Sequence, residues 1–362
     1  MQDDLRRKTR TVMVRDVAMG SDAPISVQSM TKTDTADVNA TVRQIRQLER
    51  CGCDIIRVAV LNKNAALAIG KIKPRIHIPL VADIHFDHTL ALRAMEQGAD
   101  KIRLNPGNIR KPQHIEAILA AARHYRVPIR IGVNSGSVPR RRGHDLVRDI
   151  TRAAQEYVAA FRKRGFDQIV LSLKTPDVRT TIESYRRMAE LTDLPFHLGV
   201  TATGLAEQAT VKSSIGIGAL LLEGIGDTLR VSLSGEAREE VRIGLAILAA
   251  VGLRNPGIEI IACPTCGRCS LDLVPLVKQV ERRLWPLRQH FTRRPLRVAI
   301  MGCVVNGPGE AQDADIGIAW GKGRGILFKQ GKKMRTVNKD ELLDVLYAEV
   351  RNEMDAVSSS HA

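Results

Sequence analysis

The sequence predicts an α/β protein in which an N-terminal (β/α)8 barrel of the TIM type precedes a smaller α+β domain. Two observations predict the barrel: short apolar runs recur along the chain, and each is followed by a helical pattern. Eight such units in about 250 residues match the size of this fold. An open doubly wound sheet is the alternative, but no G-x-G-x-x-G motif opens a helix after a strand.

Strands and helices are predicted to alternate through this region. The segment 37–50 shows the helical pattern, because Asp37 can cap the first turn and apolar residues follow at helical spacing. Turn-forming residues such as NPG at 105–107 separate the elements. The predicted strands are 25–30, 54–60, 78–84, 100–105, 128–134, 167–174, 195–201 and 227–233, and the other predicted helices are 88–98, 112–125, 145–164, 177–191, 208–222 and 236–251.

The pattern changes near residue 253. The runs GIEIIA, LRVAIMG and ADIGIAW predict strands, RGILFKQGKKMRTV predicts a hairpin, and helices are expected over 271–289 and 339–354. The turn-rich segment GLRNPG is the expected linker. The sequence therefore predicts two domains, 1–252 and 253–362.

Composition narrows the function classes. The formal charge is 55 − 39 = +16, which favours anionic partners, although a solvated basic surface explains many individual Lys and Arg residues equally well. Aromatic residues make up only 3%, which counts against base stacking on nucleic acid. No apolar segment has membrane-spanning length and no secretory signal begins the chain, so a cytoplasmic protein without membrane contact is expected.

Four predicted strands carry an arginine after an apolar residue. These are Arg57, Arg103, Arg130 and Arg230. A charge in a parallel strand is costly unless it is paired, and the carboxyl ends of barrel strands converge on one mouth. Several guanidinium forks around one cavity suit a diphosphate. The alternative is that these arginines pair with carboxylates in the barrel wall.

Further polar residues lie near the same strand ends. The Asp83 carboxylate and the His85 imidazole are candidates for holding substrate hydroxyls or moving protons, while a structural role is the alternative for His85. The remaining residues expected at the mouth are Asn105, Asn134, Lys174 and Ser232.

Four of the six cysteines fall in two segments, CPTCGRC at 263–269 and GCVVNGPGE at 302–310. So few cysteines do not make a disulfide scaffold, and clustered thiols point to metal or redox chemistry. A structural zinc site is one interpretation, and an iron–sulfur cluster is the other. Spacing alone assigns all four cysteines, Cys263, Cys266, Cys269 and Cys303, to one cluster.

Seven motifs occur in an order that resembles the 4-hydroxy-3-methylbut-2-enyl diphosphate synthase family. They are APISVQSMTKTDTADV, VADIHFDH, IRLNPGNI, IRIGVNSGS, EGIGDTLRVSL, IACPTCGR and MGCVVNGPGEA. The resemblance runs from about residue 10 to residue 350, and it corresponds to the bacterial two-domain form.

The resemblance implies a different set of cluster ligands from the one that spacing favours. In the family a [4Fe–4S] cluster is held by three cysteines and one glutamate, and the matching residues are Cys263, Cys266, Cys303 and Glu310. Cys269 is then a neighbouring thiol. A carboxylate binds iron less tenaciously than a thiolate does, so one iron could open toward a substrate oxygen.

The resemblance also implies the reaction. The enzyme would be an oxidoreductase of the non-mevalonate isoprenoid route that opens 2-C-methyl-D-erythritol 2,4-cyclodiphosphate with two single electrons from an acidic ferredoxin or flavodoxin. It would release water and (E)-4-hydroxy-3-methylbut-2-enyl diphosphate. A homodimer is also implied. The matching substrate-binding residues are Arg57, Arg103, Asn105, Arg130, Asn134, Lys174 and Ser232, with Arg230 a weaker match.

The chain departs from the family pattern at one position. Family members commonly read T-E-A-G after the seventh strand, whereas this chain reads TATG and has Ala202 in place of the glutamate. Thr201, Thr203, Glu207 or a water could take over its role. Two other functions stay open: another iron–sulfur barrel enzyme acting on a phosphorylated small molecule, and a nucleic-acid-binding barrel that only the basic charge supports.

Overall fold

The computed structural model describes residues 6–105, 107–109, 111–138, 145–269, 271–303, 311–321 and 323–359. The chain divides into two compact units, Met1–Arg254 and Asn255–Ala362. None of the helices in the described ranges is both long enough and apolar enough to cross a membrane.

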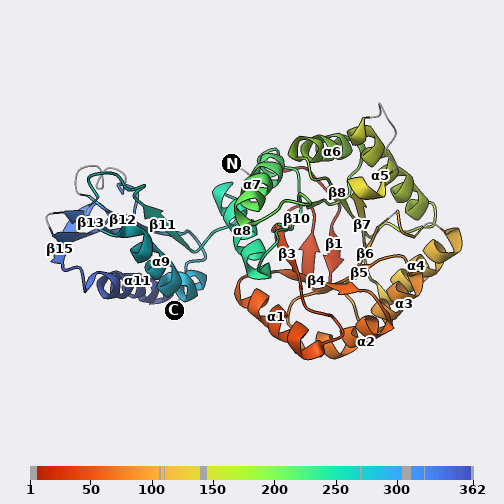
Figure 1. Cartoon of the computed structure of the whole chain (residues 1–362), viewed down its shortest axis with the longest axis horizontal. Helices are drawn as coiled ribbons and strands as arrows, with labels where there is room; N and C mark the ends of the chain where they lie inside the picture. Colours follow the sequence, from red (N-terminus) through yellow and green to blue (C-terminus); the bar gives the residue numbers. More distant parts are fainter. Residues whose placement is uncertain are drawn as a thin grey trace. The chain divides into compact units, whose positions relative to one another are not determined.

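The first unit is the predicted (β/α)8 barrel, which is confirmed (Figure 1). Eight strands pair in the order β8-β7-β6-β5-β4-β3-β10-β9, and every pairing among them is parallel. A parallel bridge between Leu171 and Phe196 closes the ring. The strands are β3 (Ser26–Met30), β4 (Ile55–Val60), β5 (Leu80–Ile84), β6 (Lys101–Leu104), β7 (Ile129–Asn134), β8 (Ile169–Lys174), β9 (His197–Leu198) and β10 (Thr228–Leu229).

Eight helices surround these strands (Figure 1). Helix α1 begins where the Asp37 side chain accepts a hydrogen bond from Ala40 N, as predicted. No residue range was predicted for α2. The helices are α1 (Val38–Arg50), α2 (Lys63–Ile72), α3 (His88–Glu96), α4 (Pro112–Tyr125), α5 (Leu146–Arg162), α6 (Val178–Leu191), α7 (Ala206–Leu222) and α8 (Ala237–Ala250).

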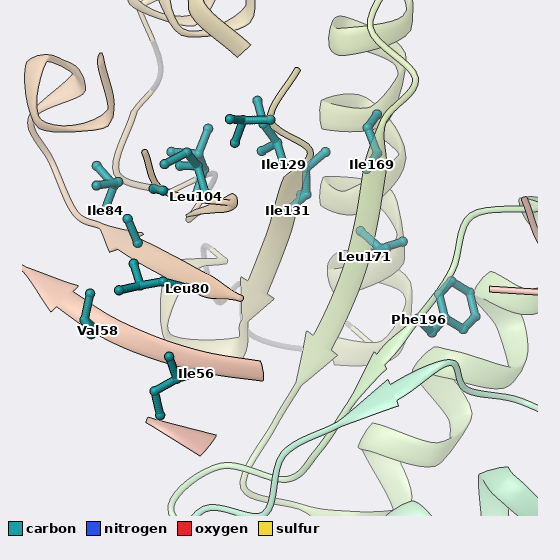
Figure 2. Close-up of a cluster of buried hydrophobic side chains, with 14 of the residues drawn as sticks. Ile56, Val58, Leu80, Ile84, Leu104, Ile129, Ile131, Ile169, Leu171 and Phe196 are labelled. Atoms are coloured by element: carbon teal, nitrogen blue, oxygen red, sulfur yellow. The ribbon is translucent and has the colours of Figure 1, made fainter. Parts of the chain in front are cut away.

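The main hydrophobic core lies between the strands and the helices. Alternate strand residues such as Ile56, Val58, Ile129 and Ile131 are fully buried on the outward face, where Figure 2 shows them grouped with their neighbours. Because side chains alternate along a strand, the residues between them point into the barrel. The outward side of each strand is therefore apolar, and the chemistry is left to the inward side.

A short antiparallel hairpin precedes the barrel and was not predicted. It consists of β1 (Val12–Val14) and β2 (Val17–Met19). Its apolar side chains form a separate buried cluster with Ile55, Val81 and Val170, which point inward from β4, β5 and β8. The hairpin therefore covers the end of the barrel at which these strands begin.

The last two barrel strands are shorter than predicted. The expected strands 195–201 and 227–233 keep only two residues each in the ladder. Gly199, with φ of 154°, follows β9 directly, so the chain leaves extended geometry there. The Tyr185 hydroxyl holds the junction between β8 and β9, because it donates to His197 O (2.6 Å) and accepts from Leu173 N (3.0 Å).

The second unit is a smaller α+β domain with a five-stranded mixed sheet in the order β11-β12-β13-β14-β15. The first three strands are parallel and the last two are antiparallel to their neighbours. The expected helix 271–289 ends as an α-helix at Leu284, and a 3-10 turn over Trp285–His290 follows because it contains Pro286. The elements are β11 (Ile258–Ala262), α9 (Leu273–Leu284), β12 (Leu296–Met301), β13 (Ile316–Gly321), β14 (Arg324–Lys329), β15 (Lys332–Val337) and α11 (Leu342–Ser359).

Candidate active site and metal centre

The inward face of the barrel is charged, although it is almost inaccessible to solvent. Strand alternation places the charges there, because the flanking residues of each strand are in the outer core. Five cationic side chains come from barrel strands and a sixth directly follows β10, and we call these six the lumen cations. They are Arg57, Lys101, Arg103, Arg130, Lys174 and Arg230.

Asp83 binds two of the lumen cations. Its carboxylate lies 3.1 Å from Arg103 Nη1 and 3.6 Å from Arg57 Nε. Burial opposes ionisation of Asp83, but Arg57, the hydrogen bond from His85, Arg103 and Arg130 outweigh it and hold the pKa of Asp83 far below its ordinary value. The ionised Asp83 can therefore accept hydrogen bonds, but it cannot serve as a proton donor near neutral pH.

His85 lies beside this pair and is half-buried. Its Nε2 is 3.2 Å from Arg103 Nη1 and 3.5 Å from Asp83, and its Nδ1 is 3.0 Å from the Asn108 amide. Asn105 shapes the same loop, because its side chain accepts from Gly107 N at 3.1 Å. The structure thus brings His85 into contact with Arg103 and Asp83, as predicted, and adds Asn108, which the sequence reasoning missed.

Arg230 is paired by an acid from outside the strands. Its Nε and Nη2 donate to the two carboxylate oxygens of Glu240 at 3.2 Å and 3.0 Å. Glu240 is fully buried on α8 and also accepts from Ser29 Oγ and binds Lys32. The alternative of wall pairing therefore describes Arg230 well, and sequence reasoning did not find this partner because it lies on a helix.

Three lumen cations have no acidic partner among the residues that the structure describes. Arg130 donates from Nη1 to Gln28 at 3.1 Å, and its Nε has no acceptor. Lys101 Nζ lies 3.4 Å from Met19 Sδ, the only hydrogen-bond contact of this amine within the described residues. Lys174 has no hydrogen bond or ion pair within the described ranges. Burial, followed by the neighbouring guanidiniums, lowers the pKa of each of the three well below its ordinary value.

Two titratable residues of the lumen were missed by the sequence reasoning. Lys101 lies two residues before Arg103 on β6, so strand alternation alone could have found it. His197, on β9, is fully buried and its Nε2 has no hydrogen-bond partner in the described chain. Burial is the first cause that lowers the pKa of His197, and Lys174 and Arg130 add to it.

The other predicted mouth residues, Asn134 and Ser232, lie at or just beyond the carboxyl ends of barrel strands. With its amide oriented to satisfy both ends, Asn134 accepts from Arg103 Nη2 at 3.3 Å. Ser232 is half-buried, and its backbone carbonyl accepts from the Thr203 hydroxyl. Ala202 is exposed and has a left-handed φ of 52°. The roles of these residues in binding stay predictions.

Cys263 and Cys303 follow two neighbouring strands of the second unit's sheet. Cys263 follows β11 and donates from its backbone N to Ile300 O on the adjacent strand β12 at 3.1 Å. Cys303 lies two residues beyond the end of β12 and is buried. Because β11 and β12 are parallel neighbours, both cysteines lie beyond the carboxyl ends of their strands, on the same side of the sheet. Cys266 is exposed one turn later, after Thr265, which has a left-handed φ of 59°.

Cys269 faces a different environment. Its thiol donates to Leu271 O at 3.2 Å, and it packs so closely against Gly302 that a Cβ at that position would overlap its sulfur. The predicted ligand Glu310 lies outside the described residues. Within the described ranges, no three His, Cys, Asp or Glu side chains are grouped as a metal site. The thiol ligand set therefore stays a prediction.

Comparison with known proteins covers both units. A family model described as the GcpE TIM-barrel domain matches residues 9–245, and one described as the GcpE protein C-terminal domain matches residues 259–352. A curated 4-hydroxy-3-methylbut-2-en-1-yl diphosphate synthase (flavodoxin) from Thermodesulfovibrio yellowstonii is 49% identical over 96% of this chain and 99% of its own length. The same enzyme from Caldanaerobacter subterraneus is 50% identical over 96% and 97%.

Among solved structures, the dihydropteroate synthase from Xanthomonas albilineans has a TM-score of 0.50 and 18% identity. It covers 67% of this chain and 98% of its own. That likeness concerns the fold alone.

Proposed function

The chain belongs to the GcpE family, and on that premise we propose that it is a 4-hydroxy-3-methylbut-2-enyl diphosphate synthase. Its substrate would be 2-C-methyl-D-erythritol 2,4-cyclodiphosphate. The reaction consumes two electrons and two protons, breaks the ring C–O bond, and releases water and (E)-4-hydroxy-3-methylbut-2-enyl diphosphate.

The observation that supports this proposal most directly is the charge imbalance of the lumen. Two acids, Asp83 and Glu240, face the six lumen cations, and each acid already binds two cations. Arg130, Lys101 and Lys174 are left without an acid in the described chain. Buried cations without counterions are costly, so the lumen is organised for an anion that comes from outside. A cyclic diphosphate carries two negative charges and suits this arrangement.

Different residues would bind different parts of the substrate. Arg57 and Arg103 are fixed in direction by Asp83, so their remaining donors are oriented before the substrate arrives. Arg130 offers uncompensated positive charge for the diphosphate, and the nearby Lys174 amine can bind a phosphate oxygen. The carboxylate of Asp83 can accept hydrogen bonds from the substrate's hydroxyl groups, and His85 lies beside it with its ring nitrogens next to Arg103 and Asn108. Because Asp83 is ionised, it positions a hydroxyl and does not donate a proton.

The second unit would hold the redox centre. Cys263 and Cys303 follow neighbouring parallel strands on the same side of the sheet, and Cys266 follows in an exposed turn, which fits thiolate ligation of a [4Fe–4S] cluster with Glu310 as the fourth ligand. The Cys269 thiol already contacts a backbone carbonyl, which favours its role as a neighbour. The cluster supplies single electrons and a Lewis-acidic iron when bound.

The partners follow from the same proposal. The curated relatives carry flavodoxin in their names, so we propose flavodoxin, or an acidic ferredoxin, as the electron donor. The charge of +16 suits an acidic donor. The homodimer implied by the family resemblance remains part of the proposal.

An anaerobic assay tests the proposed function. The reduced holoprotein is incubated with the cyclodiphosphate, and the product is followed by mass spectrometry. We expect the mass of the hydroxymethylbutenyl diphosphate to appear with wild type and to be lost with Cys263→Ser. Turnover of a different phosphorylated compound, with none of the cyclodiphosphate, would instead support another iron–sulfur barrel enzyme.

A further inference from the structure

Lys174 occupies an unusual position among the lumen cations. It is the last residue of β8, only 6% of its surface is exposed, and its amine has no acceptor in the described part of the chain. On the neighbouring segment, a Cβ at Gly199 would overlap the Lys174 Nζ, so the glycine leaves the space that the amine fills. The amine is therefore held in place by packing and not by a counterion.

The groups that face Lys174 make its charged form unfavourable in the ligand-free protein. Burial acts first, and Arg130, Arg57, Arg230 and Arg103 act in that order. His197 lies near the same amine and is itself kept uncharged by burial. The two acids of the lumen give little relief, because each is already bound by other cations. A guanidinium keeps its proton under these conditions, whereas an amine can lose it.

We propose that binding of the doubly charged cyclic diphosphate is coupled to the uptake of one proton by the Lys174 amine. This rests on the proposed function, because it assumes the ligand named there. In the free protein the amine is neutral and the guanidiniums carry the positive charge. The arriving dianion removes the repulsion, and a proton from the buffer converts the amine to an ammonium that binds a phosphate oxygen.

Lys101 and His197 fit this role less well. Lys101 lies at the beginning of β6, beside Met19 of the hairpin that covers the far end of the barrel. Its charged neighbours are Arg130 and Arg57. His197 begins β9, two residues before the glycine that Lys174 packs against. Lys174 alone ends its strand, where a barrel opens to its ligand.

Calorimetry measures the proton directly. The oxidised holoprotein is titrated anaerobically with the cyclodiphosphate, without an electron donor, in two buffers of different ionisation enthalpy. Each phosphorus of the ligand has one ester bond, one P–O–P bond and one strongly acidic oxygen, so the ligand itself does not titrate between pH 7 and pH 9. We expect uptake that approaches one proton, and an affinity that falls by up to about tenfold for each pH unit in this range.

Two variants assign the proton. Lys174→Arg carries a permanent charge, so it should bind the cyclodiphosphate with no uptake and with a flat pH dependence. Lys101→Met removes the other buried, unpaired lysine and should retain the uptake. Uptake that persists in Lys174→Arg, or that disappears in Lys101→Met, would overturn the assignment.

Calorimetry on the wild type distinguishes a failure of this inference from a failure of the proposed function. Tight binding without any proton uptake would refute this inference and leave the proposed function standing. A holoprotein that does not bind the cyclodiphosphate at all would refute the proposed function, and the coupled proton with it.

Discussion

Lys101 gives the sharpest test of how the lumen charges affect stability. Its side chain is fully buried, its only polar contact is Met19 Sδ at 3.4 Å, and no acid in the described chain pairs with it. Burial, Arg130 and Arg57 lower its pKa well below the ordinary value. Replacing a buried, unpaired cation by an apolar side chain of similar length removes a cost, so Lys101→Met should raise the free energy of unfolding by about 1–4 kcal/mol at pH 7.

The pH dependence identifies the cause. Between the lowered pKa of the folded state and about 10.4, the unfolded chain binds a proton at Lys101 that the folded chain does not. The stability of the wild type therefore rises with pH in this window, by up to about 1.4 kcal/mol for each pH unit from this residue. The Met variant lacks this contribution. Its advantage over the wild type should shrink between pH 7 and pH 9.

Urea denaturation is followed by far-UV circular dichroism, because most of the helical residues belong to the barrel. Tryptophan fluorescence reports on the second unit, which contains both tryptophans, Trp285 and Trp320. Lys71→Met, which removes an exposed lysine of α2, is the matched control. If Lys101→Met were less stable than the wild type at both pH values, or if its advantage were independent of pH, the account of an uncompensated buried amine would be wrong.

Four further variants test separate contacts. Tyr185→Phe removes the hydroxyl that joins β8 to His197 O, so denaturation should show a loss of about 1–3 kcal/mol, and an unchanged midpoint would contradict the role in barrel closure. In Arg103→Lys a single ammonium group replaces the guanidinium and cannot contact Asp83 and the other partners together. Calorimetry should therefore show cyclodiphosphate binding weakened by about 10- to 100-fold. Cys269→Ser should keep its full iron content and visible absorbance whereas Cys263→Ser should not, and loss of iron from Cys269→Ser would make that thiol a ligand. Ala202→Glu should change turnover little, and a large gain would mean that the chain lacks a group that its relatives use.

The barrel could be predicted because its signal is local. Most outer strand faces are continuous in apolar residues, and most turns contain a glycine, a proline or an asparagine. The hairpin of β1 and β2 escaped because its strands have three residues each and Arg15, at φ of 54°, occupies a turn position where glycine or asparagine is the usual signal.

From the sequence, only those site residues could be predicted whose side-chain direction follows from their position in a strand. Arg57, Arg103 and Arg130 follow from their positions in apolar strands, and Lys101 obeys the same rule. The partner of Arg230 could not be predicted in this way, because Glu240 lies on α8 and reaches Arg230 only in the packed fold. Periodicity locates a side chain on a face, whereas the choice of counterion depends on tertiary packing.

The hairpin has a consequence for synthesis of the chain. Residues 12–19 are translated early, but their apolar faces meet side chains as late as Val170, and the Arg7 side chain donates to the carbonyls of Thr192 and Leu194. This segment therefore cannot dock in its final position until roughly two hundred residues have left the ribosome. Delayed docking of this kind exposes the apolar surface of residues 12–19 during translation, which gives chaperones time to bind this segment.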